Sequence, residues 1–114
     1  MSATTSRQLD SLFFALSDPT RRGILRELAK GDATVGQLSL PFSLAPSTMT
    51  KHLAVLERAG LIDRLRDGRH RRTRLTPRPL WEAMEWIEEM RTLWTQQLDA
   101  LEELLKRERR GGGE

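Results

Sequence analysis

The residues best suited to chemistry lie between Pro46 and Leu75, where small hydroxyl side chains precede a dense group of arginines. The first part of this segment carries hydroxyls and one lysine, at Ser47, Thr48, Thr50 and Lys51. Such side chains hydrogen-bond base edges or phosphate oxygens, and a threonine methyl can contact thymine. The same residue types are also common at the solvated start of a surface helix, so their neighbours decide between the two interpretations.

The second part of the segment is rich in guanidinium groups. Six arginines occur within eleven residues, at Arg64, Arg66, Arg69, Arg71, Arg72 and Arg74. This number exceeds what solubility requires, and guanidinium groups bind phosphate oxygens in pairs of hydrogen bonds. Because side chains alternate along a strand, the arginines cannot all face one side, and some are expected to pair with acids such as Asp63. The residues near the tip, Arg69, His70 and Arg71, are the ones expected to contact DNA.

The charge of the chain is concentrated in this segment. The formal net charge of the 114 residues is +3, but residues 45–78 alone carry +6 and residues 79–114 carry −4. An uneven distribution of this kind favours a polyanionic partner at one surface. The length suits one domain, which we expect to cover residues 1–108, with a disordered tail at 109–114.

Several classes of function find no support in the sequence. There is no cysteine, which excludes disulfides, thiolate metal sites and a cysteine nucleophile. We find no nucleophile beside a base and no phosphate-binding glycine loop, so neither an enzyme nor a cofactor is expected. An apolar signal core and a stretch of membrane-spanning length are also missing, so we expect a soluble, cytoplasmic protein without a membrane partner.

Hydrophobic spacing predicts four short helices and a β-hairpin. The helices are expected at about residues 6–17, 19–30, 34–41 and 46–60, and the strands at 61–66 and 71–75. Asp18 is expected to cap the second helix, and Thr34 with Gln37 forms a capping-box pattern for the third. In the fourth helix, Met49, Leu53 and Leu56 are spaced to face the core, which leaves the hydroxyl side chains on the other side.

The last predicted helix, at about residues 79–107, carries a heptad-like apolar row. The row can pack on the chain's own core or on a second copy, and we favour the second copy because the small core is already supplied by other helices. The predicted dimer interface combines the first and last helices, through Leu9, Leu12, Phe13, Leu16, Ile87, Trp94, Leu98 and Leu101. The tryptophans Trp81, Trp86 and Trp94 can alternatively line a pocket for an apolar molecule.

The order of these elements and three phrases resemble the ArsR family of winged helix-turn-helix transcriptional repressors. The phrases are ALSDPTRRGILREL at 15–28, TMTKHLAVLERAGLI at 48–62 and DGRHRRTRL at 67–75. The resemblance covers about residues 9–107 and implies a mainly α fold with a β-hairpin wing. It also implies a homodimer on double-stranded DNA, with the fourth helix in the major groove and the wing on the flanking backbone.

The resemblance sharpens the candidate DNA contacts, which are Ser47, Thr48, Thr50, Lys51, His52, Arg69, His70 and Arg71. His52 can donate to a phosphate or pack where two helices meet, and the residues do not separate these roles. Arg21 and Arg22 are compatible with a phosphate contact or with a solvated position. Family members that sense metals use cysteines on the third helix or histidines and carboxylates on the last, and this chain matches neither pattern.

A non-metal-sensing repressor is therefore the expected function, with a small-molecule effector possible but unidentified. The acidic face of Glu85, Glu88 and Glu89 is interpreted as solvated rather than as a cation site. The alternative from another class is a winged helix that binds a protein partner. The arginine-rich hairpin favours DNA over that alternative, because a protein-binding winged helix has no need for six arginines.

Overall fold

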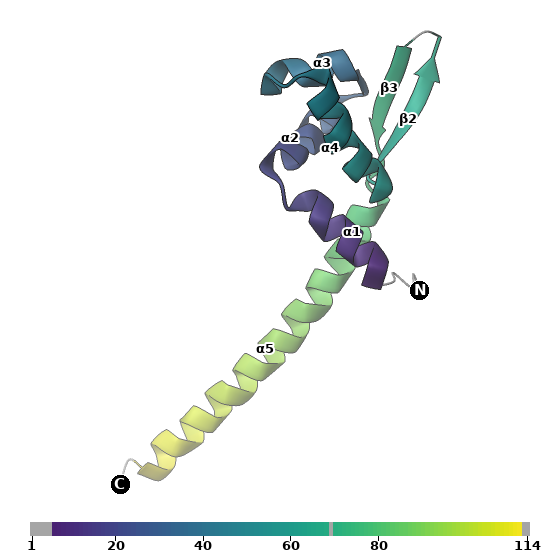
Figure 1. Ribbon diagram of the computed structural model, residues 1–114. Helices are drawn as coiled ribbons and strands as arrows, with labels where there is room; N and C mark the ends of the chain where they lie inside the picture. The colour runs from purple at the N-terminus through teal and green to yellow at the C-terminus, as the bar shows by residue number, and fades with distance from the viewer. Residues whose placement is uncertain (1–5, 69, 113–114) are drawn as a thin grey trace. The chain divides into compact units, whose positions relative to one another are not determined.

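The fold is mainly helical and carries one small antiparallel sheet (Figure 1). The computed structural model describes residues 6–68 and 70–112. Its elements are α1 (Ser6–Leu16), α2 (Pro19–Lys30), β1 (Ala33–Thr34), α3 (Val35–Phe42), α4 (Pro46–Arg58), β2 (Ile62–Asp67), β3 (His70–Leu75) and α5 (Arg78–Gly112). This order confirms the predicted winged helix-turn-helix.

The helix boundaries follow the predicted capping residues. Asp18 accepts a hydrogen bond of 3.0 Å from the Arg21 backbone amide, and Pro19 occupies the first turn of α2. At the start of α3, Thr34 and Gln37 exchange the two hydrogen bonds of a capping box. Ala45 precedes α4 and supplies no side-chain cap, as its methyl group predicts.

The sheet contains one strand that the sequence pattern did not predict. The strand order is β1-β3-β2, and the two-residue β1 pairs Ala33 with Thr73 and Thr34 with Arg72. Two residues are too few to show an alternating pattern, which explains why β1 was missed. The β2–β3 hairpin turns one residue later than predicted, because Asp67 still belongs to β2 and pairs with His70. Gly68 follows it with a positive φ of 61°.

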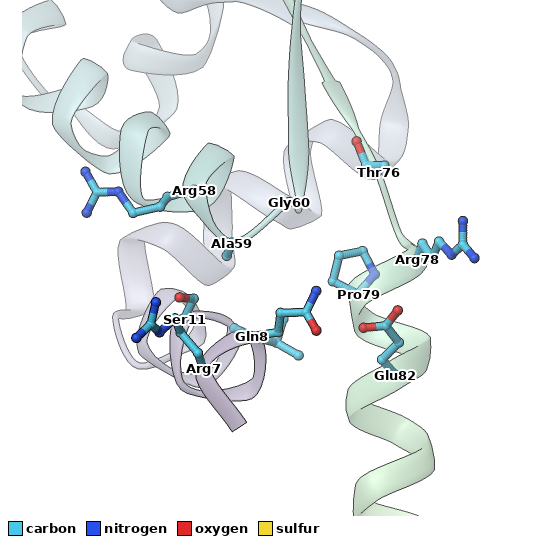
Figure 2. Close-up of a pocket in the computed structure, with 11 residues that line it drawn as sticks. Arg7, Gln8, Ser11, Arg58, Ala59, Gly60, Thr76, Arg78, Pro79 and Glu82 are labelled. Atoms are coloured by element: carbon cyan, nitrogen blue, oxygen red, sulfur yellow. The ribbon is translucent and has the colours of Figure 1, made fainter. Parts of the chain in front are cut away.

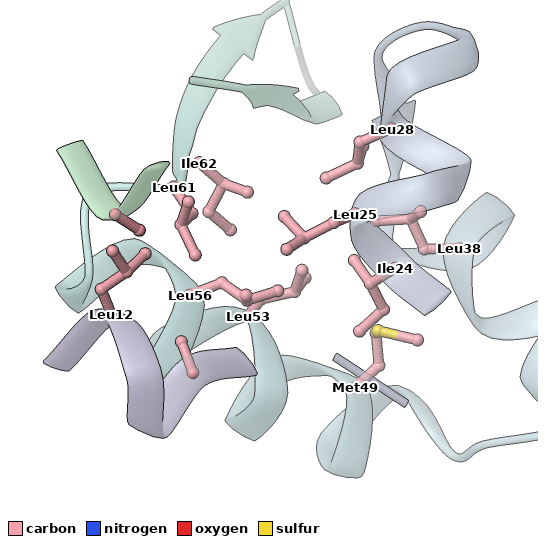
Figure 3. Packing of buried hydrophobic residues seen from close by; sticks show 12 residues of the cluster. Leu12, Ile24, Leu25, Leu28, Leu38, Met49, Leu53, Leu56, Leu61 and Ile62 are labelled. Atoms are coloured by element: carbon pink, nitrogen blue, oxygen red, sulfur yellow. The ribbon is translucent and has the colours of Figure 1, made fainter. Parts of the chain in front are cut away.

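The hydrophobic core is built by α1, α2, α3, α4, the base of the hairpin and the start of α5 (Figure 3). The predicted core residues of α4, Met49, Leu53 and Leu56, are completely buried. Because this stripe is fixed against the core, the opposite side of α4 must face outward. The core therefore positions the hydroxyl side chains that the sequence singled out.

The chain forms two compact units, Met1–Ala83 and Met84–Glu114, which meet at residue 83. The division occurs within α5, whose 35 residues would measure roughly 50 Å at about 1.5 Å per residue. The predicted disorder at 109–114 is wrong as far as Gly112, because α5 continues through these residues. A run of good helix formers up to Arg110 accounts for the extension. None of the described helices is both long and apolar enough to cross a membrane.

Candidate nucleic-acid interface

The outer side of α4 presents the four predicted contact residues to solvent. Ser47, Thr48, Thr50 and Lys51 are all exposed, whereas Met49 between them is buried. Ser47 and Lys51 are four residues apart and therefore adjoin on the helix surface, as do Thr48 and His52. Since Ala45 provides no side-chain cap, it leaves the first-turn amides of α4 and their partial positive charge to another acceptor. A phosphate oxygen has the required charge and geometry.

Thr50 differs from its neighbours because its hydroxyl is already in use. Its Oγ1 donates a hydrogen bond of 2.9 Å to the backbone carbonyl of Pro46, one turn earlier. The hydroxyl can still accept a hydrogen bond, and the methyl group stays available for an apolar contact. Thr50 is therefore suited to contact a base donor or a thymine methyl, and less suited to donate to a phosphate.

His52 is half-buried and meets two charged residues of the α1–α2 junction. Its Nδ1 lies 3.4 Å from Nη1 of Arg21 and 4.0 Å from Oδ2 of Asp18. The hydrogen bond from the Arg21 backbone amide lowers the pKa of Asp18, and the charge of the Arg21 guanidinium acts in the same direction. Both predicted roles of His52, donation to a phosphate and packing between helices, are compatible with this position, because part of its side chain is accessible.

Arg21 itself is not the solvated or phosphate-binding residue that the sequence suggested. The residue is buried, and its guanidinium donates to the carbonyls of Ala15 and Phe14 at 2.9 Å each. These carbonyls belong to the last turn of α1, and that of Phe14 also accepts from the amide and the hydroxyl of Ser17. The spacing of residues in the sequence does not predict this contact, because it forms only when α1 and α2 pack together.

The register of the β2–β3 hairpin separates the wing arginines into two sets. Residues opposite each other in register share a face, and successive residues alternate between faces. Arg64 is paired with the buried Thr73, and Arg66 with Arg71, so these three arginines share the face that is buried at the hairpin base. Together with Glu57 of α4 and Leu65 they line a cleft of about 290 Å³. Figure 1 shows the hairpin standing beside α4.

The opposite face of the hairpin is partly neutralised. Arg74 lies 3.5 Å from Asp63, its register partner, which confirms the expected pairing of a wing arginine with this acid. Arg72 lies on the same face as this ion pair. Of the predicted tip contacts, Arg71 is exposed, whereas Arg69 and the side chain of His70 lie outside the described part of the chain.

The predicted dimer residues fall into a buried group and an exposed group. Leu12 is only 2% exposed and belongs to the core of its own chain, so it has almost no surface to offer a second copy. Leu9 and Leu16 are partly buried against the same core, which leaves Phe13 as the most exposed of the four α1 residues. The exposed group on α5 consists of Ile87, Trp94, Leu98 and Leu101.

The exposed residues of α5 form an apolar groove within the second unit. The groove has a volume of about 530 Å³ and is lined by Trp86, Ile87, Met90, Arg91, Trp94, Thr95 and Leu98. On the same helix, Glu88 pairs with Arg91, which agrees with a solvated role for this acid. This ion pair lowers the pKa of Glu88. No cluster of three or more metal-binding side chains occurs in residues 6–68 and 70–112.

A cavity of about 440 Å³ lies in the first unit between α1, the end of α4 and the segment from Thr76 to Glu82 (Figure 2). Three arginines, Arg7, Arg58 and Arg78, lie around it. In Figure 2 the guanidinium groups of Arg58 and Arg78 point away from the space between the helices. The charged groups therefore do not converge on one ligand position.

An exposed polar helix face beside a basic hairpin defines a winged helix-turn-helix DNA-binding protein. Comparison with known proteins agrees with this class. A model of a helix-turn-helix domain matches residues 16–64. The chain is 33% identical over 79 residues to the transcriptional repressor SdpR of Bacillus subtilis, an alignment that covers 69% of this chain and 88% of that protein.

Solved structures extend the similarity to nearly the whole fold. The crystal structure of an ArsR family transcriptional regulator is 37% identical, with a TM-score of 0.76, and the match covers 82% of this chain and 97% of that one. An ArsR-like transcriptional regulator from Rhodococcus sp. RHA1 is 31% identical, with a TM-score of 0.77 and coverage of 86% and 92%. The chain belongs to the ArsR family of DNA-binding transcriptional regulators.

Proposed function

We propose that the protein is a homodimeric repressor that binds an inverted-repeat operator. The observation that carries the proposal is the exposed row of Ser47, Thr48 and Lys51 on α4, held outward by the buried stripe on the other side. Their hydroxyl and ammonium groups suit base edges in a major groove. Two copies would place two such helices about one helical turn (~34 Å) apart on one face of the DNA. Occupancy would exclude the polymerase, and SdpR, the similar Bacillus subtilis protein, is a repressor.

The wing would hold the DNA backbone rather than read its sequence. Arg64, Arg66 and Arg71 share the face of the hairpin that borders α4, and no acid of β2 or β3 is their register partner. We therefore add Arg64 and Arg66 to the tip residues as candidate phosphate contacts. Arg74 is a weaker candidate because Asp63 neutralises it.

The dimer would form mainly through α5. Large apolar side chains from Ile87 to Leu105 are exposed, and Trp94 and Leu98 retain 70% and 64% of their surface. A contiguous apolar surface of this kind marks a binding site for another macromolecule. We assign it to a second copy rather than to a small apolar ligand, because the apolar row extends beyond the groove to Leu101, Leu104 and Leu105. An effector, if one exists, would act by changing the spacing of the two DNA-binding heads.

Fluorescence anisotropy with a duplex from the promoter of the protein's own gene tests the proposal. The affinity should exceed that for a scrambled duplex by about 10³-fold or more at physiological salt. Both affinities should fall when the salt concentration rises, because phosphate contacts release counterions. Equal affinities for the two duplexes at both salt concentrations would reject a sequence-specific operator in that promoter.

A further inference from the structure

The buried guanidinium of Arg21 has one nitrogen, Nη1, that does not bind the end of α1. Nε and Nη2 donate to the carbonyls of Ala15 and Phe14, and the group lies 5.0 Å from the centre of the Phe14 ring. These three contacts fix the position of the guanidinium. The remaining nitrogen, Nη1, is held 3.4 Å from Nδ1 of His52 on α4.

A hydrogen bond across this contact requires a particular tautomer of His52. A guanidinium has five N–H donors, no acceptor and a permanent charge, so it can hydrogen-bond Nδ1 only through a lone pair. In a neutral imidazole, a lone pair on Nδ1 places the hydrogen on Nε2. The carboxylate of Asp18 favours the opposite arrangement, but its Oδ2 is 4.0 Å from Nδ1 and already accepts the Arg21 backbone amide. A separation of 4.0 Å is beyond hydrogen-bond length.

The resulting donor belongs to the DNA-facing side of α4. His52 follows the exposed Lys51 and lies one turn after the exposed Thr48, so it adjoins both on the helix surface. Its side chain is 20% exposed, although Nδ1 is turned to Arg21 and Asp18. Phosphate oxygens only accept hydrogen bonds, so an imidazole that contacts DNA through a phosphate must present N–H.

We propose that Arg21 is a positioning residue that sets the tautomer of His52, with the hydrogen of the neutral ring on Nε2, which donates to a DNA phosphate. The donation to a phosphate rests on the proposed function. The tautomer is a property of the free protein and can be measured without DNA.

The tautomer can be measured directly by long-range ¹H–¹⁵N correlation spectra of the full chain. His70 is the only other histidine, so a His70→Asn variant assigns the signals. At pH 8, above the usual titration range of histidine, Nδ1 of His52 should show the shift of an unprotonated nitrogen and Nε2 that of a protonated one. A protonated Nδ1, or averaged shifts on both nitrogens, would overturn the tautomer assignment.

An Arg21→Lys variant tests whether Arg21 is the cause. Lysine keeps the charge but cannot reach two carbonyls and the imidazole together, so the shifts of the two nitrogens should move towards each other. Unchanged shifts in a folded variant would mean that Arg21 does not set the tautomer. If the variant fails to fold, the comparison of His52 variants below still decides whether Nε2 is the donor.

Two amide substitutions separate the ring nitrogens in DNA binding. The amide nitrogen of His52→Gln can replace Nε2–H, whereas that of His52→Asn lies near the position of Nδ1. With the promoter duplex, His52→Gln should bind within about twofold of the parent protein. His52→Asn and His52→Ala should each bind about tenfold more weakly, as expected for the loss of a hydrogen bond to a charged group. Equal losses in the Gln and Asn variants, with circular dichroism unchanged, would contradict donation from Nε2.

The two parts of the proposal can fail separately from the proposed function. If the parent protein does not prefer its promoter duplex, the proposed operator in that promoter is wrong. The tautomer spectra still test whether Arg21 sets the tautomer of His52. If the parent binds and the Gln and Asn variants are alike, the operator stands and the role of His52 is wrong.

Discussion

Helices α4 and α5 carry apolar side chains at the same helical spacing, but they use them in opposite ways. The stripe of α4 is completely buried at Leu53 and Leu56, whereas Leu98 and Leu101 of α5 keep more than half of their surface. Their polar sides differ as well. On α5, Glu88 pairs with Arg91 and Glu102 with Lys106, while the outer side of α4 presents hydroxyls and Lys51. One helix therefore offers a polar face to a partner, and the other offers an apolar face.

The spacing of apolar residues indicates that a segment is helical, but it does not indicate what covers the apolar stripe. Burial in the chain's own core stabilises the fold, whereas an exposed stripe gains its free energy only when a second molecule covers it. The polar face of α4 and the apolar face of α5 are thus candidate surfaces for different partners, DNA and a second copy. Changes on the two helices should have separable consequences.

The largest expected effect is loss of the dimer when charges enter the α5 stripe. Leu98→Glu combined with Leu101→Glu would place unpaired carboxylates in an apolar interface, which costs several kcal/mol. Light scattering should report a monomer, and circular dichroism should report an intact fold. Matched glutamates at Thr92 and Gln96, which are exposed and do not line the groove, should leave the mass unchanged. A dimer that survives in the Leu98 and Leu101 variant would mean that α5 is not the interface.

A truncation in the α4 stripe should instead destabilise the fold itself. Leu53→Ala removes a fully buried side chain and should lower the free energy of unfolding by about 2–5 kcal/mol. The matched change Leu98→Ala should leave the unfolding of the monomer nearly unchanged, since exposed substitutions cost about 0.5 kcal/mol or less. Urea denaturation at low protein concentration measures both, and similar losses for the two variants would abolish the distinction between the stripes.

Changes on the polar face of α4 should affect sequence preference. Thr48→Ala combined with Lys51→Ala should weaken binding to the promoter duplex by about 1–3 kcal/mol per lost base contact. Binding to the scrambled duplex should change far less, because base contacts add little to non-specific affinity. Anisotropy titrations of both duplexes check this. Equal losses on both would assign these residues to the backbone and not to base reading.

The wing should contribute affinity without sequence preference, and its two faces should differ. Arg66→Ala combined with Arg71→Ala should reduce the magnitude of the slope of log affinity against log salt by about 2, which is roughly 0.9 per phosphate contact. The control is Arg72→Ala combined with Arg74→Ala, which removes the same charge from the opposite face. A smaller change is expected there, because Arg74 is paired with Asp63. The same slope in both variants would show that the faces are equivalent.

The smallest expected effect concerns the acid stability of the α1–α2 junction. The pKa of Asp18 is lowered in the folded protein, chiefly by the hydrogen bond from the Arg21 amide. Its ionised form therefore stabilises the fold above about pH 4, and this contribution is lost as the pH falls through the lowered value. Asp18→Asn keeps an equally good helix cap but cannot titrate. Urea denaturation between pH 3 and pH 6 should show the parent losing its advantage over Asp18→Asn at the acid end, and a constant difference would contradict the role of the charge.

Local signals allowed much of the fold to be predicted. The caps at Asp18 and Thr34 and the hairpin signal at Asp67-Gly68 act within a few residues, so the sequence reports them directly. The two-residue β1 and the helical tail were missed for opposite reasons. β1 is too short to show a pattern. The glycines of the tail predict disorder, although strong helix formers precede them.

The candidate site was predictable only in part, because its remaining features depend on contacts between distant residues. The exposed row on α4 follows from the spacing of Met49 and Leu53. The division of the wing arginines needs the strand register, and the link from Arg21 to His52 joins residues 31 positions apart. Leu12 is predicted at an interface because its spacing matches Leu9 and Leu16, and this spacing does not report its burial in the core of its own chain.

Selection from a randomised duplex library tests the central claim most directly, because it needs no prior operator. The purified full chain should enrich an inverted repeat whose half-site centres are about one helical turn, or ~10 base pairs, apart. The Thr48→Ala, Lys51→Ala variant should lose this enrichment while it still retains bulk DNA. Enrichment of no sequence, or of a single half-site without its repeat, would contradict a dimer that reads DNA through α4.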